Sequence, residues 1–107
     1  MNNEYELINN LDESISELPA DSIVSKTIYK SENQKVILFG FSSGQELSDH
    51  TSSSNAIIHI IKGNGVINVG GETISAVSGT WLHMKPELPH SVSALSDMHM
   101  LLYLFPE

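Results

Sequence analysis

The sequence predicts a single all-β domain, an antiparallel sandwich or barrel, preceded by a short N-terminal arm or helix. From residue 23 onward, eight short stretches are rich in β-branched and aromatic residues, and turn residues separate them about every eight to twelve positions. The length of 107 residues leaves room for one domain only. We therefore assign residues 1–22 to the arm or helix and residues 23–107 to the barrel, both as parts of one domain.

The N-terminal segment carries a helix-like pattern, because its apolar side chains recur at roughly helical spacing at Leu7, Leu11, Ile15 and Leu18. Asn10 is a suitable N-cap, and Glu13 three residues later would close a capping box. Pro19 would end the helix. This pattern predicts a short helix, with an extended arm as the alternative.

The expected strands are read from β-branched and aromatic runs bounded by turn residues. Gly70-Gly71 separates two of them and supplies the positive φ of a two-residue hairpin turn. The serine-rich and glycine-rich stretch 42–55 is read as loop or irregular strand. The strands are expected at residues 22–29, 35–41, 56–61, 66–69, 72–77, 81–84, 91–94 and 98–105.

Composition restricts the classes of partner. The formal net charge is -8, and all five basic residues are lysines. An acidic chain without arginine is poorly suited to nucleic acids, anionic membranes and phosphorylated substrates. The chain has no cysteine, which excludes disulfides, thiolate zinc sites and thiol catalysis. No apolar run reaches the ~20 residues of a membrane span, and no basic leader with an apolar stretch is visible, so we expect a cytoplasmic protein.

Two stretches, residues 44–56 and 79–94, each contain an imidazole in an extended run punctuated by glycine or proline. These imidazoles are His50 and His90. Residues so distant in sequence can share a pocket only if strands of a sheet bring them together. We therefore expect His50 and His90 to lie on neighbouring strands and to converge on one cavity.

The two stretches resemble the two sequence motifs of the cupins, and the resemblance covers residues 23–106. Gly44, His50 and Gly63 are in register with the first motif, and Gly79 and His90 with the second. The resemblance implies an RmlC-like double-stranded β-helix, or jelly-roll barrel, of two antiparallel sheets. The chain resembles in particular the small stand-alone cupins without an assigned activity. Such cupins are often homodimers.

The resemblance also implies a reduced metal site. Metal-binding cupins use three histidines and one glutamate, and the corresponding positions here are His50, Ser52, Ala56 and His90. Ser52 is a poor ligand and Ala56 has no donor atom. The candidate cofactor is one divalent transition metal (zinc, nickel, iron or manganese) held by His50 and His90. Glu46 lies four residues before His50, so a regular strand would place both on one face and offer Glu46 as a third ligand.

Strand alternation assigns the remaining side chains. With Ala56 pointing into the barrel, Ile58 and Ile60 also point inward, and Leu82 and Met84 line the barrel. The opposite face then carries Ile57, His59, Ile61, Trp81 and His83. His99 is another histidine that could supply a ligand. The predicted pocket consists of His50, His90, Glu46, Ser52, Ala56 and Met84.

These observations predict a small cupin barrel that binds a small-molecule ligand in the pocket of His50 and His90. The alternative is a metal-dependent enzyme, a dioxygenase or an isomerase, whose reduced ligand set is completed by Glu46 or water. A sugar epimerase ranks last, because no tyrosine is placed as an acid partner for a histidine base. No residue is assigned a catalytic role. We expect a homodimer, because Ile57, Ile61 and Trp81 would otherwise leave an apolar patch on the outer face.

Overall fold

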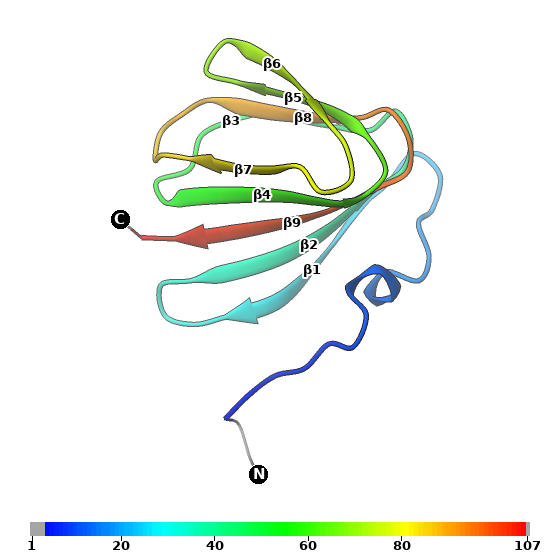
Figure 1. The fold of residues 1–107 in the computed structure, drawn as a ribbon, viewed down its shortest axis with the longest axis vertical. Helices are drawn as coiled ribbons and strands as arrows, with labels where there is room; N and C mark the ends of the chain where they lie inside the picture. Colours follow the sequence, from blue (N-terminus) through cyan, green and yellow to red (C-terminus); the bar gives the residue numbers. More distant parts are fainter. Residues whose placement is uncertain (1–3, 107) are drawn as a thin grey trace.

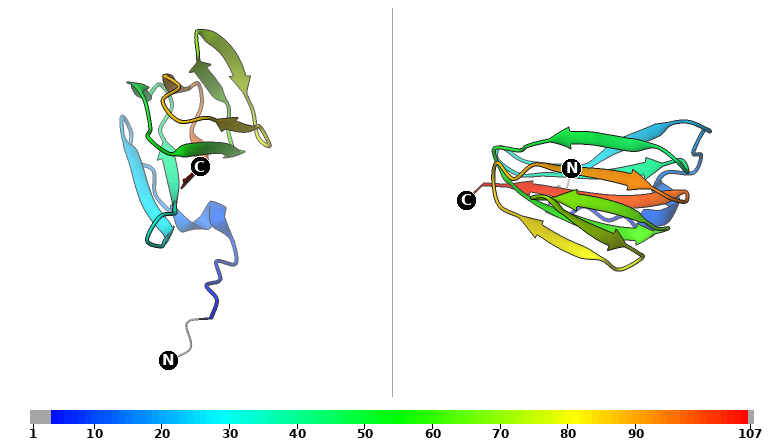
Figure 2. Two further views of the ribbon diagram at one scale, coloured as in Figure 1. Left: turned by 90° about the vertical axis from the view of Figure 1, so that its left-hand side faces the viewer. Right: turned by 90° about the horizontal axis from the view of Figure 1, so that it is seen from above.

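The computed structural model describes residues 4–106 and shows two antiparallel β-sheets that face each other (Figures 1 and 2). One 3-10 turn, η1 (Leu11–Ser14), precedes the strands. The strands are β1 (Ile23–Lys30), β2 (Lys35–Phe41), β3 (Glu46–His50), β4 (Asn55–Lys62), β5 (Gly65–Val69), β6 (Glu72–Ala76), β7 (Trp81–Met84), β8 (His90–Ala94) and β9 (Met98–Phe105).

The strand order is that of a jelly roll. The five-stranded sheet has the order β1-β2-β9-β4-β7, and the four-stranded sheet has the order β3-β8-β5-β6. The predicted all-β fold is thus confirmed, and every expected strand is present within one or two residues of its predicted bounds. Strand β3 lies within residues 42–55, for which the sequence predicts a loop or an irregular strand.

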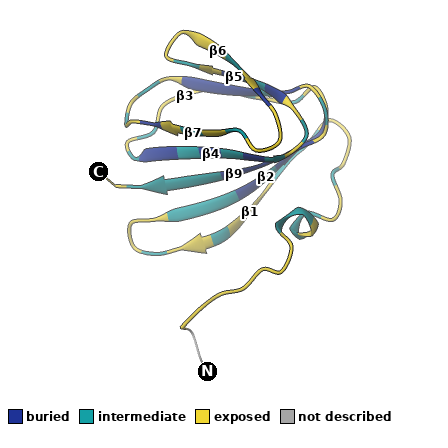
Figure 3. Ribbon diagram, viewed as in Figure 1, coloured by how far each residue is buried: buried dark blue, intermediate teal, exposed yellow. Residues whose placement is uncertain are grey.

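The core lies between the two sheets and is formed by their inward apolar side chains (Figure 3). Ala56, Ile58 and Ile60 belong to this core, whereas Ile57 and Ile61 on the opposite face are only half-buried. The alternation predicted for this strand is therefore confirmed. The largest fully buried side chains are Phe41, Leu38, Ile58, Ile60, Ile67, Met84, Met98, Met100 and Val92.

The N-terminal segment forms one short 3-10 helix of four residues, and the residues on either side of it, Asn10 and Ile15, have an extended backbone. Asn10 caps this turn, since its Oδ1 atom accepts a hydrogen bond of 3.0 Å from the amide of Asp12. The chain becomes extended again at Ile15, with φ -114° and ψ 92°. No helix in residues 4–106 has the length and apolar character needed to cross a membrane.

Tertiary contacts explain why the helix does not continue to Leu18, as the helix-like spacing would allow. A Cβ atom added at Gly40 on β2 would lie 3.2 Å from the Cδ1 atoms of both Ile15 and Leu18. These apolar side chains therefore pack on the outer face of the five-stranded sheet. Leu38 and Leu101, which are opposite each other on β2 and β9, are buried on the same face. Packing on a sheet overrides the local helical preference.

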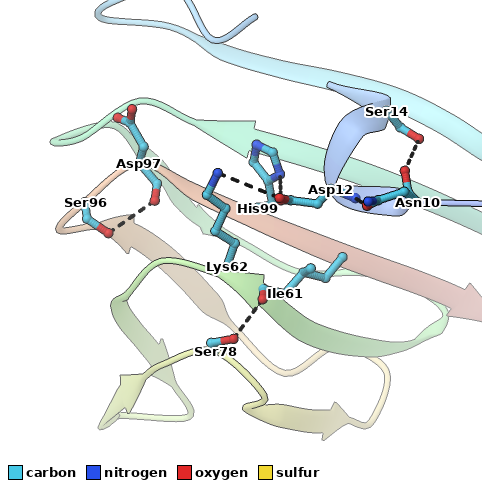
Figure 4. Close-up of polar contacts among 9 residues, drawn as sticks. All are labelled: Asn10, Asp12, Ser14, Ile61, Lys62, Ser78, Ser96, Asp97 and His99. Atoms are coloured by element: carbon cyan, nitrogen blue, oxygen red, sulfur yellow. Dashed lines mark hydrogen bonds and ion pairs between the residues drawn. The ribbon is translucent and has the colours of Figure 1, made fainter. Parts of the chain in front are cut away.

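A polar contact joins the N-terminal segment to this outer face (Figure 4). Asp12 Oδ1 lies 2.8 Å from Nδ1 of His99, a side chain that is 7% exposed. Lys62 Nζ lies 3.8 Å from the other carboxylate oxygen of Asp12. Within residues 4–106, neither Asp12 Oδ1 nor His99 Nδ1 has a hydrogen-bond partner elsewhere. Asp12 is therefore the polar group that compensates the buried imidazole.

Replacing Asp12 by alanine should lower the free energy of unfolding by about 1–3 kcal/mol, because it leaves the buried Nδ1 atom of His99 without a polar neighbour. The neighbouring Glu13→Ala is the matched control and should cost less than about 0.5 kcal/mol, because this side chain is exposed. Urea denaturation of both variants measures the difference. Equal losses would show that the contact between Asp12 and His99 does not stabilise the fold.

The turn between β4 and β5 provides a second test of packing. Gly63 has φ +85°, and a Cβ atom there would lie 2.9 Å from Met98 Cα and would also collide with the carbonyl oxygen of Asp97. Gly71 has the same φ of +85° with no atom within 4 Å of the added Cβ. Gly71→Ala should therefore lower the free energy of unfolding by about 1–2 kcal/mol, because alanine is strained in the left-handed backbone conformation.

Gly63→Ala should cost about 1–3 kcal/mol more than Gly71→Ala, because backbone atoms must move to accommodate the new methyl group. Thermal or urea denaturation of the two variants gives this difference directly. If the two substitutions proved equally costly, crowding by the backbone of Asp97 and Met98 would not contribute to stability.

Candidate functional site

His50 and His90 lie directly opposite each other at one end of the four-stranded sheet. His50 is the last residue of β3, and His90 is the first residue of β8 (Figure 1). Directly opposite residues on antiparallel strands point to the same face of a sheet. The two rings are accordingly in edge-to-face contact, with centroids 4.2 Å apart and an interplanar angle of 61°.

An irregularity in β3 makes this pairing possible. Leu47 is opposite Val92, but His50 is three positions after Leu47, whereas His90 is two positions before Val92. The extra residue is accommodated by a shift in register between Leu47 and His50. In a regular ladder Asp49, and not His50, would lie opposite His90.

The same irregularity corrects the expectation for Glu46. Glu46 is opposite Ser93, next to the pair of Leu47 with Val92, and Leu47 packs against the core. Because neighbouring residues in a strand point to opposite faces, Glu46 points away from the core, and it is exposed. The prediction that Glu46 shares a face with His50 is wrong, because it assumed a regular strand.

Both imidazoles are oriented by backbone carbonyl groups. His50 Nδ1 lies 2.9 Å from the carbonyl oxygen of Ser48, and His90 Nδ1 lies 3.0 Å from that of Leu88. A carbonyl oxygen only accepts hydrogen bonds, so each Nδ1 atom carries the proton and donates it. In the neutral rings, each Nε2 atom is therefore unprotonated and has a free lone pair.

Burial distinguishes the two histidines. His90 is 4% exposed, whereas His50 is exposed at the rim. Burial lowers the pKa of His90 below its usual value of 6.5, and the nearby His50 acts in the same direction. The hydrogen bond to the Leu88 carbonyl and the charge of Asp49 oppose this shift without cancelling it. His90 is therefore neutral at pH 7 and offers its Nε2 lone pair.

This pKa shift also links His90 to stability. The folded protein binds the His90 proton less tightly than the unfolded chain does, because the pKa is lowered on folding. The neutral ring therefore makes its full contribution to stability above about pH 6.5, and that contribution is lost as the pH falls through the lowered pKa.

The other predicted pocket residues lie at different depths. Ala56 is opposite Met84 on β7, and both are buried in the core between the sheets. Ser52 lies in the loop before β4, where its hydroxyl oxygen accepts a 3.1 Å hydrogen bond from the amide of Ser54. The carbonyl oxygen of Ser52 accepts a 2.8 Å hydrogen bond from the amide of Glu87. Ser52 thus joins the two loops that follow β3 and precede β8.

The donor set does not match a complete metal site of the cupin type. In residues 4–106, no group of three or more histidine, aspartate or glutamate side chains is arranged to hold a metal ion. Ala56 stands at a ligand position of the motif and has no donor atom. A catalytic metal normally has at least three protein ligands. The described residues offer two histidine ligands, His50 and His90, which is at least one protein ligand too few for such a metal.

The remaining histidines have other environments. His83 Nε2 lies 2.7 Å from Asn55 Oδ1, and its ring stacks on Phe105 with centroids 6.1 Å apart. His59 is half-buried on the outer face of β4, opposite Trp81. Asn55 was not singled out from the sequence, because a single asparagine at the start of a strand gives no periodic signal. None of these contacts connects His59 or His83 to the pair of His50 and His90.

Comparison with known proteins agrees with this architecture. The family model described as the AraC-like ligand binding domain matches residues 38–105. No curated protein sequence matches the chain.

Solved structures of small proteins resemble the chain over almost its full length. An RmlC-like cupin protein from Desulfovibrio desulfuricans has a TM-score of 0.80 and 29% identity, covering 95% of this chain and 97% of that one. A conserved protein of unknown function from Streptococcus pyogenes has a TM-score of 0.83 and 24% identity, covering 97% and 90% of the two chains.

An enzyme shares the fold at lower identity. A salicylate 1,2-dioxygenase variant from Pseudoaminobacter salicylatoxidans has a TM-score of 0.74 and 13% identity, covering 89% of this chain and 30% of the enzyme. This likeness concerns the fold alone.

The family match spans most of the chain and includes both His50 and His90. The chain is therefore a small cupin and belongs to the AraC-like ligand-binding domain family.

Proposed function

We propose that this protein binds a small molecule at the end of the barrel where β3 and β8 bring His50 and His90 together. The observation that carries the proposal is the orientation of both rings by backbone carbonyl groups, which leaves the Nε2 atom of each neutral ring as a hydrogen-bond acceptor. Such atoms accept hydrogen bonds from a ligand, and they are oriented before the ligand arrives. The match to a family described as ligand-binding supports the same class of function.

The chemistry of the pair indicates the kind of ligand. Two adjacent acceptors favour a molecule with two hydrogen-bond donors, such as a neutral diol or an amine. The net charge of -8 and the absence of arginine disfavour phosphates and other multiply charged anions. Large apolar side chains fill the space between the sheets, so we place the ligand at the rim, beside the exposed His50.

The ligand should require the neutral imidazole of His90. We expect fragments with vicinal hydroxyl groups or a primary amine to shift the NMR signals of His50 and His90, and to bind more weakly as the pH falls through the lowered pKa of His90. The reason is that protonation of Nε2 converts the acceptor into a donor. His50→Phe and His90→Phe keep a flat ring without the lone pair and should weaken binding by at least about 10-fold.

His59→Phe is the control, because this histidine is on the outer face, and it should leave fragment binding unchanged. Heteronuclear NMR titration with a defined fragment set, from pH 5 to pH 8, measures each affinity. Binding that is equally strong at pH 5, or that survives both substitutions at the pair, would contradict the proposal.

The metal-dependent alternative can be tested separately. His50 and His90 would fill two positions around a divalent ion, and water would fill the others, so we expect weak binding that a chelator reverses. Calorimetric titration with zinc and nickel should give no detectable binding for His50→Phe. Tight zinc binding by the natural sequence would reveal a third protein ligand and would favour the enzyme alternative over simple ligand binding.

We also propose that the chain forms a homodimer. The sequence assigned the contact to Ile57, Ile61 and Trp81 on the outer face of the five-stranded sheet. Trp81 is 60% exposed and supports this assignment, but both isoleucines are half-buried within one chain. The outer face therefore offers one large exposed hydrophobic side chain at this place.

A further inference from the structure

The register of the four-stranded sheet extends the histidine pair into a row of four residues that crosses the whole sheet at one end (Figure 1). His50 is opposite His90, His90 is opposite Val69, and Val69 is opposite Glu72. Directly opposite residues on antiparallel strands point to the same face of a sheet. Glu72 therefore lies on the same face as the two imidazoles. We refer to these four residues as the end row.

Burial along β6 shows independently that Glu72 is on the inner face of the sheet. Ile74 and Ala76 follow Glu72 by two and four positions, and both pack in the core between the sheets. Residues two positions apart in a strand point to the same face. Glu72 is the first residue of β6 and is exposed, so its carboxylate lies where the inner face meets the solvent.

A two-residue turn fixes which face Glu72 occupies. Gly70 and Gly71 have φ values of +55° and +85°, both in the left-handed region, and they connect β5 directly to β6. The amide of Gly70 donates a 3.1 Å hydrogen bond to the carbonyl oxygen of Pro89, the residue before His90. The position of Glu72 relative to His90 is therefore set by the backbone.

The middle of the end row is apolar. Val69 separates His90 from Glu72 and packs against the core. Leu88 packs at the neighbouring turn, since a Cβ atom added at Gly70 would lie 3.2 Å from its Cδ1 atom. Neighbouring strands are about 4.8 Å apart, so the two strand steps from His90 to Glu72 span about 10 Å. Hydrogen-bond acceptors thus lie at both ends of an apolar stretch.

Carboxylates predominate in the segments beside the end row. Asp49 and Glu87 are exposed, the first directly before His50 and the second in the loop before β8. Lys85 is the exposed basic residue of this loop. Glu72 forms no side-chain hydrogen bond or ion pair with any residue from 4 to 106. Its carboxylate is therefore available to a cation from outside the chain.

We propose that the end row binds an elongated aliphatic diamine, with Glu72 as the residue that selects for its second positive charge. This inference rests on the proposed function and narrows its ligand class. One amino group donates hydrogen bonds to the Nε2 atoms of His50 and His90, the aliphatic chain lies along Val69, and the other ammonium group pairs with Glu72. A neutral diol cannot form this ion pair, so the end row favours the diamine over the diol.

The first experiment measures the span of the end row with α,ω-diaminoalkanes, from ethylenediamine to octanediamine. NMR titration of the natural chain should find that the affinity passes through a maximum at an intermediate length. Shorter diamines cannot reach from the imidazoles to Glu72, and longer ones must bend. A monoamine as long as the best diamine should bind at least about 10-fold more weakly, because it has no charge to pair with Glu72.

The second experiment changes the charge at the far end of the row. Glu72→Gln keeps the size of the side chain and removes its charge. It should weaken the binding of the best diamine at least about 10-fold and change that of the matched monoamine by less than about 2-fold. Glu72→Lys should reverse the preference, so that an ω-amino carboxylic acid of the same length binds more tightly than the diamine.

Glu32→Gln is the matched control, because Glu32 is an exposed glutamate in the turn between β1 and β2, outside the four-stranded sheet. It removes the same net charge as Glu72→Gln and should change diamine affinity by less than about 2-fold. An equal loss in both variants would show that the diamines respond to the overall negative charge of the chain, and it would overturn the inference.

The remaining outcomes separate this inference from the proposed function. If His90→Phe abolishes amine binding while Glu72→Gln or the chain length has no effect, the histidine pair binds a ligand but the end row does not select a diamine. Amine binding that survives both His50→Phe and His90→Phe overturns both proposals. Failure of every amine to bind overturns the inference, and failure of vicinal diols as well overturns the proposed function.

Discussion

The inward side chains of the two sheets pack against each other along the barrel, and this packing decides where polar chemistry can occur. Ile58 and Ile60 of one sheet and Ile67 and Val92 of the other belong to a single core cluster. An interior of this kind has few spaces larger than a water molecule. Polar groups that are free to act must therefore lie at the ends of the strands or on the outer faces, and His50 lies at such an end.

Two contacts at the strand ends show how the backbone supports the histidine pair. The loop after β3 and the loop before β8 are joined by the hydrogen bond from the Glu87 amide to the Ser52 carbonyl oxygen. The Pro89 carbonyl oxygen accepts a 3.1 Å hydrogen bond from the Gly70 amide in the turn after β5. Residues on both sides of His90 are thus held by backbone contacts. The orientation of the rings is a property of the backbone and does not require a ligand.

The sequence predicted the fold well because alternation and turn residues are local signals. Gly70-Gly71 marked the hairpin between β5 and β6, and the run from Ala56 to Ile61 showed correctly which side chains face the core. At the N-terminus the predicted short helix is limited to the 3-10 helix at Leu11–Ser14, and Ile15 and Leu18 pack at Gly40 instead of continuing it. That preference depends on a strand about 25 residues away in sequence and has no local signature.

The candidate site was predictable only in part. The resemblance at Gly44, His50 and His90 indicated the strand ends at which the two rings meet. It could not indicate the extra residue in β3, because a bulge depends on how two strands pair and not on the composition of one. Glu46 was consequently assigned to the wrong face. The ligand itself stays a proposal. Two imidazoles whose tautomers are set by backbone carbonyl groups define which hydrogen bonds a ligand can make, but they do not identify the molecule.

The extra residue in β3 also affects how this strand can vary in length among related chains. If Ser48 were deleted, His50 would follow Leu47 by two positions and would lie opposite His90 in a ladder without an irregularity, although the His50 ring would lose the carbonyl group to which its Nδ1 atom donates. A lineage could thus lose one residue from the motif and keep its paired imidazoles. Spacing counted from Gly44 would then differ between proteins that have the same pair. Natural selection can preserve the pairing of His50 with His90 across β3 and β8 without preserving the number of residues between Gly44 and His50.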